Sequence, residues 1–205
     1  GTNGEMVLGT KNHMIATAAS AGPAFEGAGI SGGMPGIPGA ISQVNFLGKR
    51  LSTTTIGGKA PIGICGTGIL EAVCELYKAG IIGKNGTLQE TYRENGYPLA
   101  QKDDTSTIFF TGQDVRQVQL AKSAIRSGIE LLLKYYGITA DEVDQVYLAG
   151  GFGQTLNVRK AVTLGLIPKK FEKKTIALGN TSLLGAGAYV HAKQIGKHPE
   201  ADMRR

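Results

Sequence analysis

The sequence contains no tryptophan, few aromatic residues and little cysteine. Aromatic residues make up 6% of the 205 positions, and the two cysteines, Cys65 and Cys74, lie nine residues apart. That spacing fits neither a CxxC metal knuckle nor a disulfide framework. Both thiols are therefore predicted to be small buried hydrophobic groups in a helix. The 3 histidines show no ligand spacing either, so no protein-bound metal site is predicted.

Targeting and membrane signals are also missing from the sequence. No stretch has the pattern of a secretory signal peptide, and no apolar run is long enough to span a bilayer. We therefore expect a cytoplasmic protein with no membrane partner.

The common nucleotide-binding fingerprints are absent as well. The nearest match to a P-loop, at residues 57–60, lacks the required spacing and hydroxyl residue. A GxGxxG string occurs at residues 27–32, but it follows Pro-Ala-Phe-Glu instead of a strand and lacks the acidic residue about 20 positions further on. We interpret it as a consequence of the high glycine content.

Glycine is the abundant residue, with 31 copies that fall mostly in short clusters. Such clusters indicate tight turns and close backbone approaches instead of a flexible linker. The formal net charge is +6, which is compatible with a polyanionic nucleotide or an acidic protein as partner. The basic residues are scattered and no basic strand is studded with aromatic residues, so nucleic acid is not an expected partner.

Hydrophobic periodicity predicts an α/β fold with a mixed sheet flanked by helices. Hairpins are predicted early in the chain and parallel crossovers late. The predicted hairpins occupy residues 1–18 and 41–56, the helices 63–80, 112–136, 157–164 and 182–194, and the strands 108–110, 145–149 and 175–178. Residues 81–106 are polar and rich in turns. We therefore predict a core of about 1–80 and 138–205, with an inserted subdomain at about 81–137.

Two glycine turns stand at positions where α/β proteins bind ligands. Residues 1–4, Gly-Thr-Asn-Gly, open a hairpin whose backbone N–H groups can point at a phosphate. Residues 148–153, Leu-Ala-Gly-Gly-Phe-Gly, end a hydrophobic strand and lead into a helix, where a base or ribose can lie against the backbone. Together, the two turns at either end of one α/β unit favour a nucleotide site.

Longer strings are more specific than these turns. They are Gly-Thr-Asn-Gly-Glu at 1–5, Ala-Gly-Pro-Ala-Phe-Glu-Gly at 21–27, the segment 112–125, and the glycine turn at 148–153. They resemble the ATP-binding domains of the actin, sugar-kinase and heat-shock-chaperone class, and more narrowly the reductive activators of corrinoid proteins. The similarity covers essentially the whole chain. It implies a ribonuclease-H-like mixed sheet, forming the C-terminal half of an actin-like ATPase domain.

The resemblance also implies an activity: ATP-dependent return of a Co(II) corrinoid to Co(I) for methyl transfer. The implied cofactors are ATP and Mg²⁺, together with a [2Fe–2S] cluster in an N-terminal domain. That domain and the upstream half of the ATPase domain are expected to precede this chain, so the 205-residue chain alone is expected to be inactive. The implied partner is the corrinoid protein of a methyltransferase system, and a homodimer is expected.

The resemblance further assigns roles to single residues. The residues expected to bind nucleotide are Gly1, Thr2, Asn3, Gln119, Lys122, Gly150, Gly151 and Phe152. The first three are expected at the β- and γ-phosphates, the last three at the adenosine, and the two helical residues at the adenine or ribose. Lys122 fits a solvated helix face equally well.

The one candidate catalytic residue is Glu26, which can orient magnesium-bound water. A helix N-terminal acid stabilised by the helix dipole is an equally good explanation of this glutamate. The principal catalytic acid is expected upstream of the chain. Two alternative functions remain open: a small-molecule kinase of the same fold, and a non-catalytic dimerisation or docking module.

Overall fold

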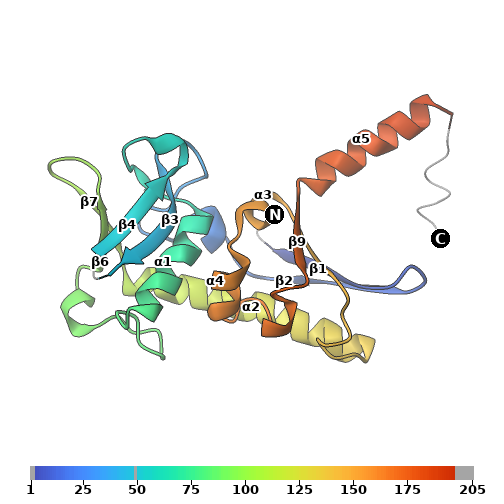
Figure 1. The fold of residues 1–205 in the computed structure, drawn as a ribbon, viewed down its shortest axis with the longest axis horizontal. Coiled ribbons are helices and arrows are strands. Elements are labelled where there is room, and N and C mark those ends of the chain that lie inside the picture. The colour runs from blue at the N-terminus through green and yellow to red at the C-terminus, as the bar shows by residue number, and fades with distance from the viewer. Residues whose placement is uncertain (1–2, 49, 197–205) are drawn as a thin grey trace.

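The elements of the computed structural model, which describes residues 3–48 and 50–196, follow one another as hairpins, helices and late parallel strands (Figure 1). The strands are β1 (Gly4–Gly9), β2 (Met14–Ala19), β3 (Ala40–Leu47), β4 (Arg50–Thr55), β5 (Gly63–Ile64), β6 (Tyr97–Gln101), β7 (Thr107–Phe110), β8 (Val146–Ala149) and β9 (Thr175–Gly179). The helices are α1 (Gly66–Lys78), α2 (Gly112–Tyr136), α3 (Gly151–Thr155), α4 (Val158–Thr163) and α5 (Thr181–Gln194).

The helix α2 is the longest element and runs along the length of the molecule (Figure 1). Its start is fixed by a capping box, in which the Thr111 side chain accepts from the Asp114 backbone N–H and the Asp114 side chain accepts from the Thr111 backbone N–H. Its end is fixed by Gly137, whose positive φ of 82° suits a left-handed C-cap. Between these ends, α2 packs on both strands of the β1–β2 hairpin.

The first hydrophobic core lies between α1, α2 and the sheet β4–β3–β5. Strand β3 pairs antiparallel with β4 and parallel with β5. A Cβ atom at Gly68 would collide with the carbonyl oxygen of Ile41, so glycine is what allows α1 to approach β3 so closely. Core side chains such as Ile41, Ile69 and Phe110 are fully buried.

A second core joins β8, which pairs in parallel with β9, to α2 and α4. Leu70 of α1 and Leu133 of α2 belong to it, and Ala161 of α4 and Phe171 complete its centre. The last helix, α5, follows β9 and projects outward with no buried residue along its length (Figure 1).

The structure confirms the predicted α/β class and most of the predicted elements. Within the described residues the strands form four separate sheets, β1–β2, β4–β3–β5, β6–β7 and β8–β9, instead of one mixed sheet. Strand β6 was not predicted, because Pro98 and the surrounding polar residues hide its pattern. Residues 139–142 form a hydrogen-bonded turn in which Glu142 N donates to Thr139 O.

The predicted inserted subdomain corresponds to the β6–β7 hairpin and its turns, followed by α2. The hairpin lies at the edge of the molecule (Figure 1), whereas α2 packs on β1, β2 and α1. The helix thus belongs physically to the core, and the division at about residues 81–137 stays a prediction.

A buried ion-pair network fastens α1, α4 and β3 together. The Lys160 ammonium lies 2.9 Å from Glu71 Oε2 and 3.2 Å from Glu75 Oε1. It also donates to the carbonyl oxygen of Val44 at 2.8 Å. Burial acts to raise the pKa of Glu75, but hydrogen bonds from Lys78 and Lys160 outweigh it and lower that pKa below its ordinary value.

We expect Lys160→Met to destabilise the fold strongly. The substitution leaves the Glu71 carboxylate buried and without its cation, a change that typically costs about 3–5 kcal/mol. The matched control is Lys78→Met, since Lys78 pairs with Glu75 at the surface, where an ion pair is worth about 0–1 kcal/mol. The free energy of unfolding, measured by urea titration, should separate the two variants. Equal losses would mean that the network does not fasten the core.

Candidate nucleotide cleft

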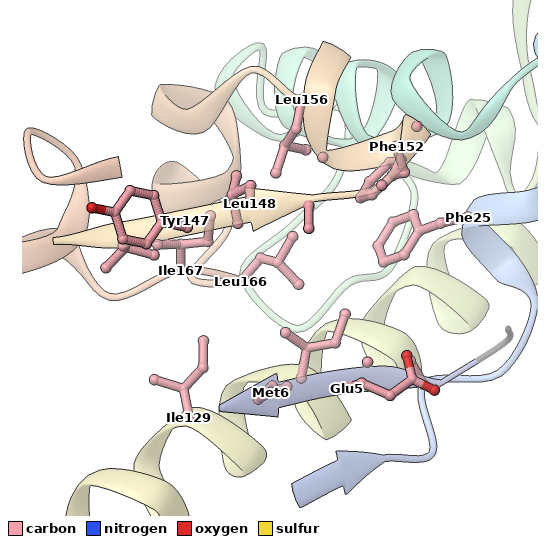
Figure 2. A pocket seen from close by; sticks show the side chains of 18 of the residues that line it. Glu5, Met6, Phe25, Ile129, Tyr147, Leu148, Phe152, Leu156, Leu166 and Ile167 are labelled. Carbon is pink, nitrogen blue, oxygen red and sulfur yellow. The ribbon is translucent and has the colours of Figure 1, made fainter. Parts of the chain in front are cut away.

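A cleft of about 1810 Å³ separates β1 from β8 (Figure 2). Apolar side chains of α2 and of the second core line much of it, and the labelled ones include Ile129, Leu148, Leu156, Leu166 and Ile167. One end of the cleft is polar and rich in glycine: Asn3 and Gly4 meet it from β1, and Gly150 and Gly151 from the end of β8.

Five of the residues predicted from the sequence meet at this cleft: Asn3, Glu26, Gly150, Gly151 and Phe152. Asn3 precedes β1, Glu26 lies in the short turn Ala24–Glu26, and the other three follow β8. Gly1 and Thr2 lie outside the described residues. Their predicted contacts with the phosphates stay a prediction.

The glycine turn after β8 leaves its backbone open to a ligand. Gly150 has a φ of 95°, which side-chain-bearing residues rarely adopt, and its N–H donates to Gly179 O at 2.7 Å. Gly151 begins α3, and a Cβ atom built on it would meet nothing within 4 Å. A flat group can therefore lie against this turn without displacing protein atoms.

An aromatic pair closes the cleft beside the glycine turn. The rings of Phe25 and Phe152 stack with centroids 4.8 Å apart and an interplanar angle of 21° (Figure 2). Phe25 comes from the short turn Ala24–Glu26 and was not singled out from the sequence. The stack fixes the Phe152 ring at the cleft, and its contact with adenosine stays a prediction.

Gln119 and Lys122 do not face this cleft. They line a separate cavity of about 170 Å³, and Phe25 lines both that cavity and the main cleft. Gln119 Nε2 donates to the Asn85 carbonyl oxygen at 3.3 Å. The structure therefore does not bring these two side chains together with the glycine turn, and their contact with adenine or ribose stays a prediction.

Sequence reasoning also missed Glu5, Thr181 and Ser182 as lining residues. Glu5 points its carboxylate toward the polar end of the cleft (Figure 2). The alternation of β1 was the available signal, because it places Glu5 and Val7 on the exposed face, while Met6 on the other face packs toward α2. Thr181 and Ser182 begin α5, directly after the strand that pairs with β8.

Neither cysteine is part of a ligand set. Cys65 and Cys74 are both buried and unpaired as thiols, as predicted. Cys65 stands at the N-cap of α1, with its thiol 3.3 Å from the Ile41 carbonyl oxygen. Burial raises the pKa of the Cys74 thiol above its ordinary value. Over residues 3–48 and 50–196, no group of three or more His, Cys, Asp or Glu side chains is placed to hold a metal ion.

The fold and the cleft together define an α/β domain of the actin, sugar-kinase and heat-shock-chaperone class. The family model described as the "C-terminal domain of RACo the ASKHA domain" matches residues 1–202. The chain belongs to this family.

Characterised relatives carry matching descriptions. A corrinoid activation enzyme, RamQ of Eubacterium limosum, is 33% identical over 95% of this chain and 36% of its own length. A "[Co(II) methylated amine-specific corrinoid protein] reductase" of Methanosarcina barkeri is 31% identical over 89% of this chain and 36% of its own length. A solved structure, "Reductive activator for corrinoid, iron-sulfur protein", superposes with a TM-score of 0.84 at 36% identity, over 95% of this chain and 34% of its own.

The chain thus spans about a third of the length of these relatives (36%, 36% and 34%). No helix in the part of the chain that the structure describes has the length and apolar character needed to cross a membrane.

Both thiols should resist modification in the folded chain. Thiolate is the reactive form, and burial both excludes the reagent and, at Cys74, disfavours thiolate. A water-soluble disulfide reagent at pH 8 should label neither cysteine until urea is added, and then both. Rapid labelling of one cysteine under native conditions would show that its surroundings are open and would contradict the assignment as a core residue.

Proposed function

We propose that this chain supplies part of the nucleotide cleft of an ATP-dependent activator that returns a Co(II) corrinoid protein to Co(I). The observation that carries the proposal is the meeting of Asn3, Gly150 and Gly151 at one cleft, in a member of this family. The relatives described as corrinoid activation enzyme and corrinoid protein reductase support the substrate class. They do not favour the kinase alternative.

In this proposal, ATP lies along the polar end of the cleft. The Gly1–Asn3 turn would hold the β- and γ-phosphates through backbone N–H groups, as turns of successive amides do. Gly150 and Gly151 would lie against the adenosine, because the backbone there is open on the cleft side. Phe152 would flank the base, with its ring held by Phe25.

The described residues could bind Mg²⁺ only together with the nucleotide phosphates, and not as a metal ion held by protein ligands alone. Magnesium usually keeps several waters and takes one or two carboxylates together with substrate phosphates. Glu26 and Glu5 both line the cleft, and we propose that Glu26 orients magnesium-bound water.

The described residues do not fit a [2Fe–2S] cluster. Such a cluster takes four cysteine thiolates or a mixed cysteine and histidine set, and the chain has two cysteines, both buried in the core. We propose that the cluster belongs to an N-terminal domain of the full-length protein. This chain would then contribute nucleotide binding and conformational coupling, and no part of the electron path.

The coupling follows from differential binding. A ligand can shift an equilibrium between two conformations only by as much as its affinities for them differ. ATP held between the β1 side and the β8 side of the cleft would favour the conformation in which the two sides are closest. We further propose a cytoplasmic homodimer that acts on the corrinoid protein of a methyltransferase system, without nucleic-acid or membrane partners.

Gly151→Arg should abolish ATP binding without unfolding the protein. Gly151 is exposed, begins a helix and has open space around it, so an arginine can be accommodated but will project into the cleft. Isothermal calorimetry on the full-length protein with Mg·ATP should show binding that the variant loses. At ATP about 100-fold above Kd, the parent should gain about 2.7 kcal/mol of stability and the variant none.

Gly112→Arg is the matched control, since Gly112 also begins a helix in open space but does not line the cleft. It should bind ATP like the parent. A full-length parent that folds and ignores Mg·ATP would remove the nucleotide proposal and favour the docking-module alternative.

A further inference from the structure

The helix α3 carries the glycine turn but is too short to hold its own shape. It spans 5 residues, Gly151–Thr155, which is little more than one helical turn. Gln154 N donates to Gly150 O at 3.0 Å and closes that turn. A first helical turn is unfavourable by itself, because several dihedral angles are fixed for one hydrogen bond. The geometry of the glycine turn therefore depends on contacts at the two ends of α3.

Each end of α3 has a directional anchor. At the start, Gly150 N donates to Gly179 O at 2.7 Å. Beyond the other end, Asn157 Nδ2 donates to Glu71 Oε1 of α1 at 3.2 Å. Leu156, between α3 and Asn157, packs against the second core, but a hydrophobic contact has no preferred direction. The two hydrogen bonds are therefore what set the orientation of α3.

Glu71 is itself held in one place. It is 6% exposed, and its Oε2 atom accepts from Val44 N at 3.1 Å and from Lys160 Nζ at 2.9 Å. These two partners come from β3 and α4, so the carboxylate cannot turn to follow a moving α3. The bond to Oε1 therefore fixes Asn157, which is the exposed partner.

The side chain of Asn157 has two separable roles. Its Oδ1 atom caps α4 by accepting from Lys160 N at 3.2 Å, and its Nδ2 atom makes the bond to Glu71. Aspartate caps a helix about as well as asparagine does. It has no donor for Glu71 when ionised. Asn157→Asp therefore keeps the cap and removes the bond.

The helix α1 also supports α3 near its start. A Cβ atom at Gly66 would lie 3.3 Å from the Phe152 ring and would collide with the carbonyl oxygen of Phe25. Gly66 stands in the first turn of α1, and Glu71 follows further along the same helix. One helix thus contacts the segment after β8 at Phe152 and again at Asn157.

We propose that Asn157 and Glu71 are positioning residues, which hold the glycine turn in the geometry that binds adenosine. The inference rests on the proposed function of the cleft. Gly150 and Gly151 offer a ligand backbone alone, and no side chain near them fixes their conformation. A turn that is ordered only on binding lowers the affinity, because the ordering cost is subtracted from the interaction.

Asn157→Asp should weaken the binding of Mg·ATP to the full-length protein about fivefold or more, the effect of losing one hydrogen bond to a charged group. Glu71→Gln should have a similar effect. Its oxygen is needed by Val44 N and Lys160, so its amide nitrogen faces the Asn157 amide. Isothermal calorimetry measures both dissociation constants.

The double variant provides the rescue. When Asn157→Asp and Glu71→Gln are combined, the introduced amide can donate to the introduced carboxylate, so the bond is restored in the opposite direction and the net charge is that of the parent. Because residues in direct contact are energetically coupled, the double variant should bind Mg·ATP within about twofold of the parent.

Asn45→Ala is the matched control. Asn45 lies on β3, outside the lining of the cleft, and its Oδ1 atom accepts from Lys160 Nζ at 3.2 Å. The substitution removes one partner of Lys160 without touching Asn157. It should leave the affinity for Mg·ATP unchanged. A loss equal to that of Asn157→Asp would mean that any loosening of the ion-pair network weakens binding, and would overturn the specific role of Asn157.

Amide hydrogen exchange of the nucleotide-free full-length protein gives a second readout. The Gly150 amide should exchange about fivefold or more faster in each single variant, because α3 opens more often when one anchor is lost. In the double variant its rate should return toward that of the parent. The Ile64 amide, which donates to Gly32 O at 2.8 Å in the first core, should keep its rate in all variants. General destabilisation would speed both amides.

The outcomes separate this inference from the proposed function. Single variants that bind Mg·ATP like the parent, or a double variant no tighter than the weaker single variant, would overturn the positioning role. A folded parent that does not bind Mg·ATP would remove the proposed function. The exchange of Gly150 then decides the positioning of the turn alone: faster exchange with recovery in the double variant supports it, and unchanged exchange overturns it.

Discussion

The separation of β1 from β8 is the constraint on which the site depends. Strand β1 packs on α2, and β8 packs in the second core, to which α2 also contributes. Backbone from the β1 side and from the β8 side lines the polar end of the cleft. No single element of the described chain forms that end alone. A binding site formed in this way responds to any change in the distance between the two sides. The proposed coupling of nucleotide binding to corrinoid reduction requires this property.

Two contacts fix the β8 side of the cleft. The glycine turn itself has few side-chain contacts, since Gly150 and Gly151 present open backbone. Its position is set at one end by the hydrogen bond from Gly150 to Gly179, and beside it by the stack of Phe152 on Phe25. The segment after α3 is fastened through Asn157, whose amide donates to Glu71 at 3.2 Å, within the network around Lys160. The buried charges therefore fasten the segment that follows the turn and α3.

Much of the fold could be predicted because local signals agreed with the tertiary structure. The capping box at Thr111, the glycine stop at Gly137 and the apolar stripe between them defined α2 to within a residue. The four separate sheets could not be foreseen, because strand pairing depends on contacts between distant segments. Strand β6 was missed for a local reason, because Pro98 and the surrounding polar residues hide its pattern.

The site was predicted in part. Asn3 and Gly150 were singled out because glycine turns at the ends of strands carry a recognisable local signal, and both line one cleft. Their contacts with nucleotide stay a prediction. Gln119 and Lys122 were grouped with them through their helical spacing, which fixes a face of α2 but not the cavity that this face meets. Phe25 carries no local signal at all. Its role in stacking on Phe152 depends on a contact across 127 positions of sequence (152 − 25).

The most direct test of the nucleotide cleft is a crystal structure of the full-length protein with Mg²⁺ and a non-hydrolysable ATP analogue. The adenosine should lie against the backbone of Gly150 and Gly151, with the phosphates beside Asn3. A nucleotide bound elsewhere, with the space between β1 and β8 unchanged from the nucleotide-free protein, would contradict the assignment of this cleft.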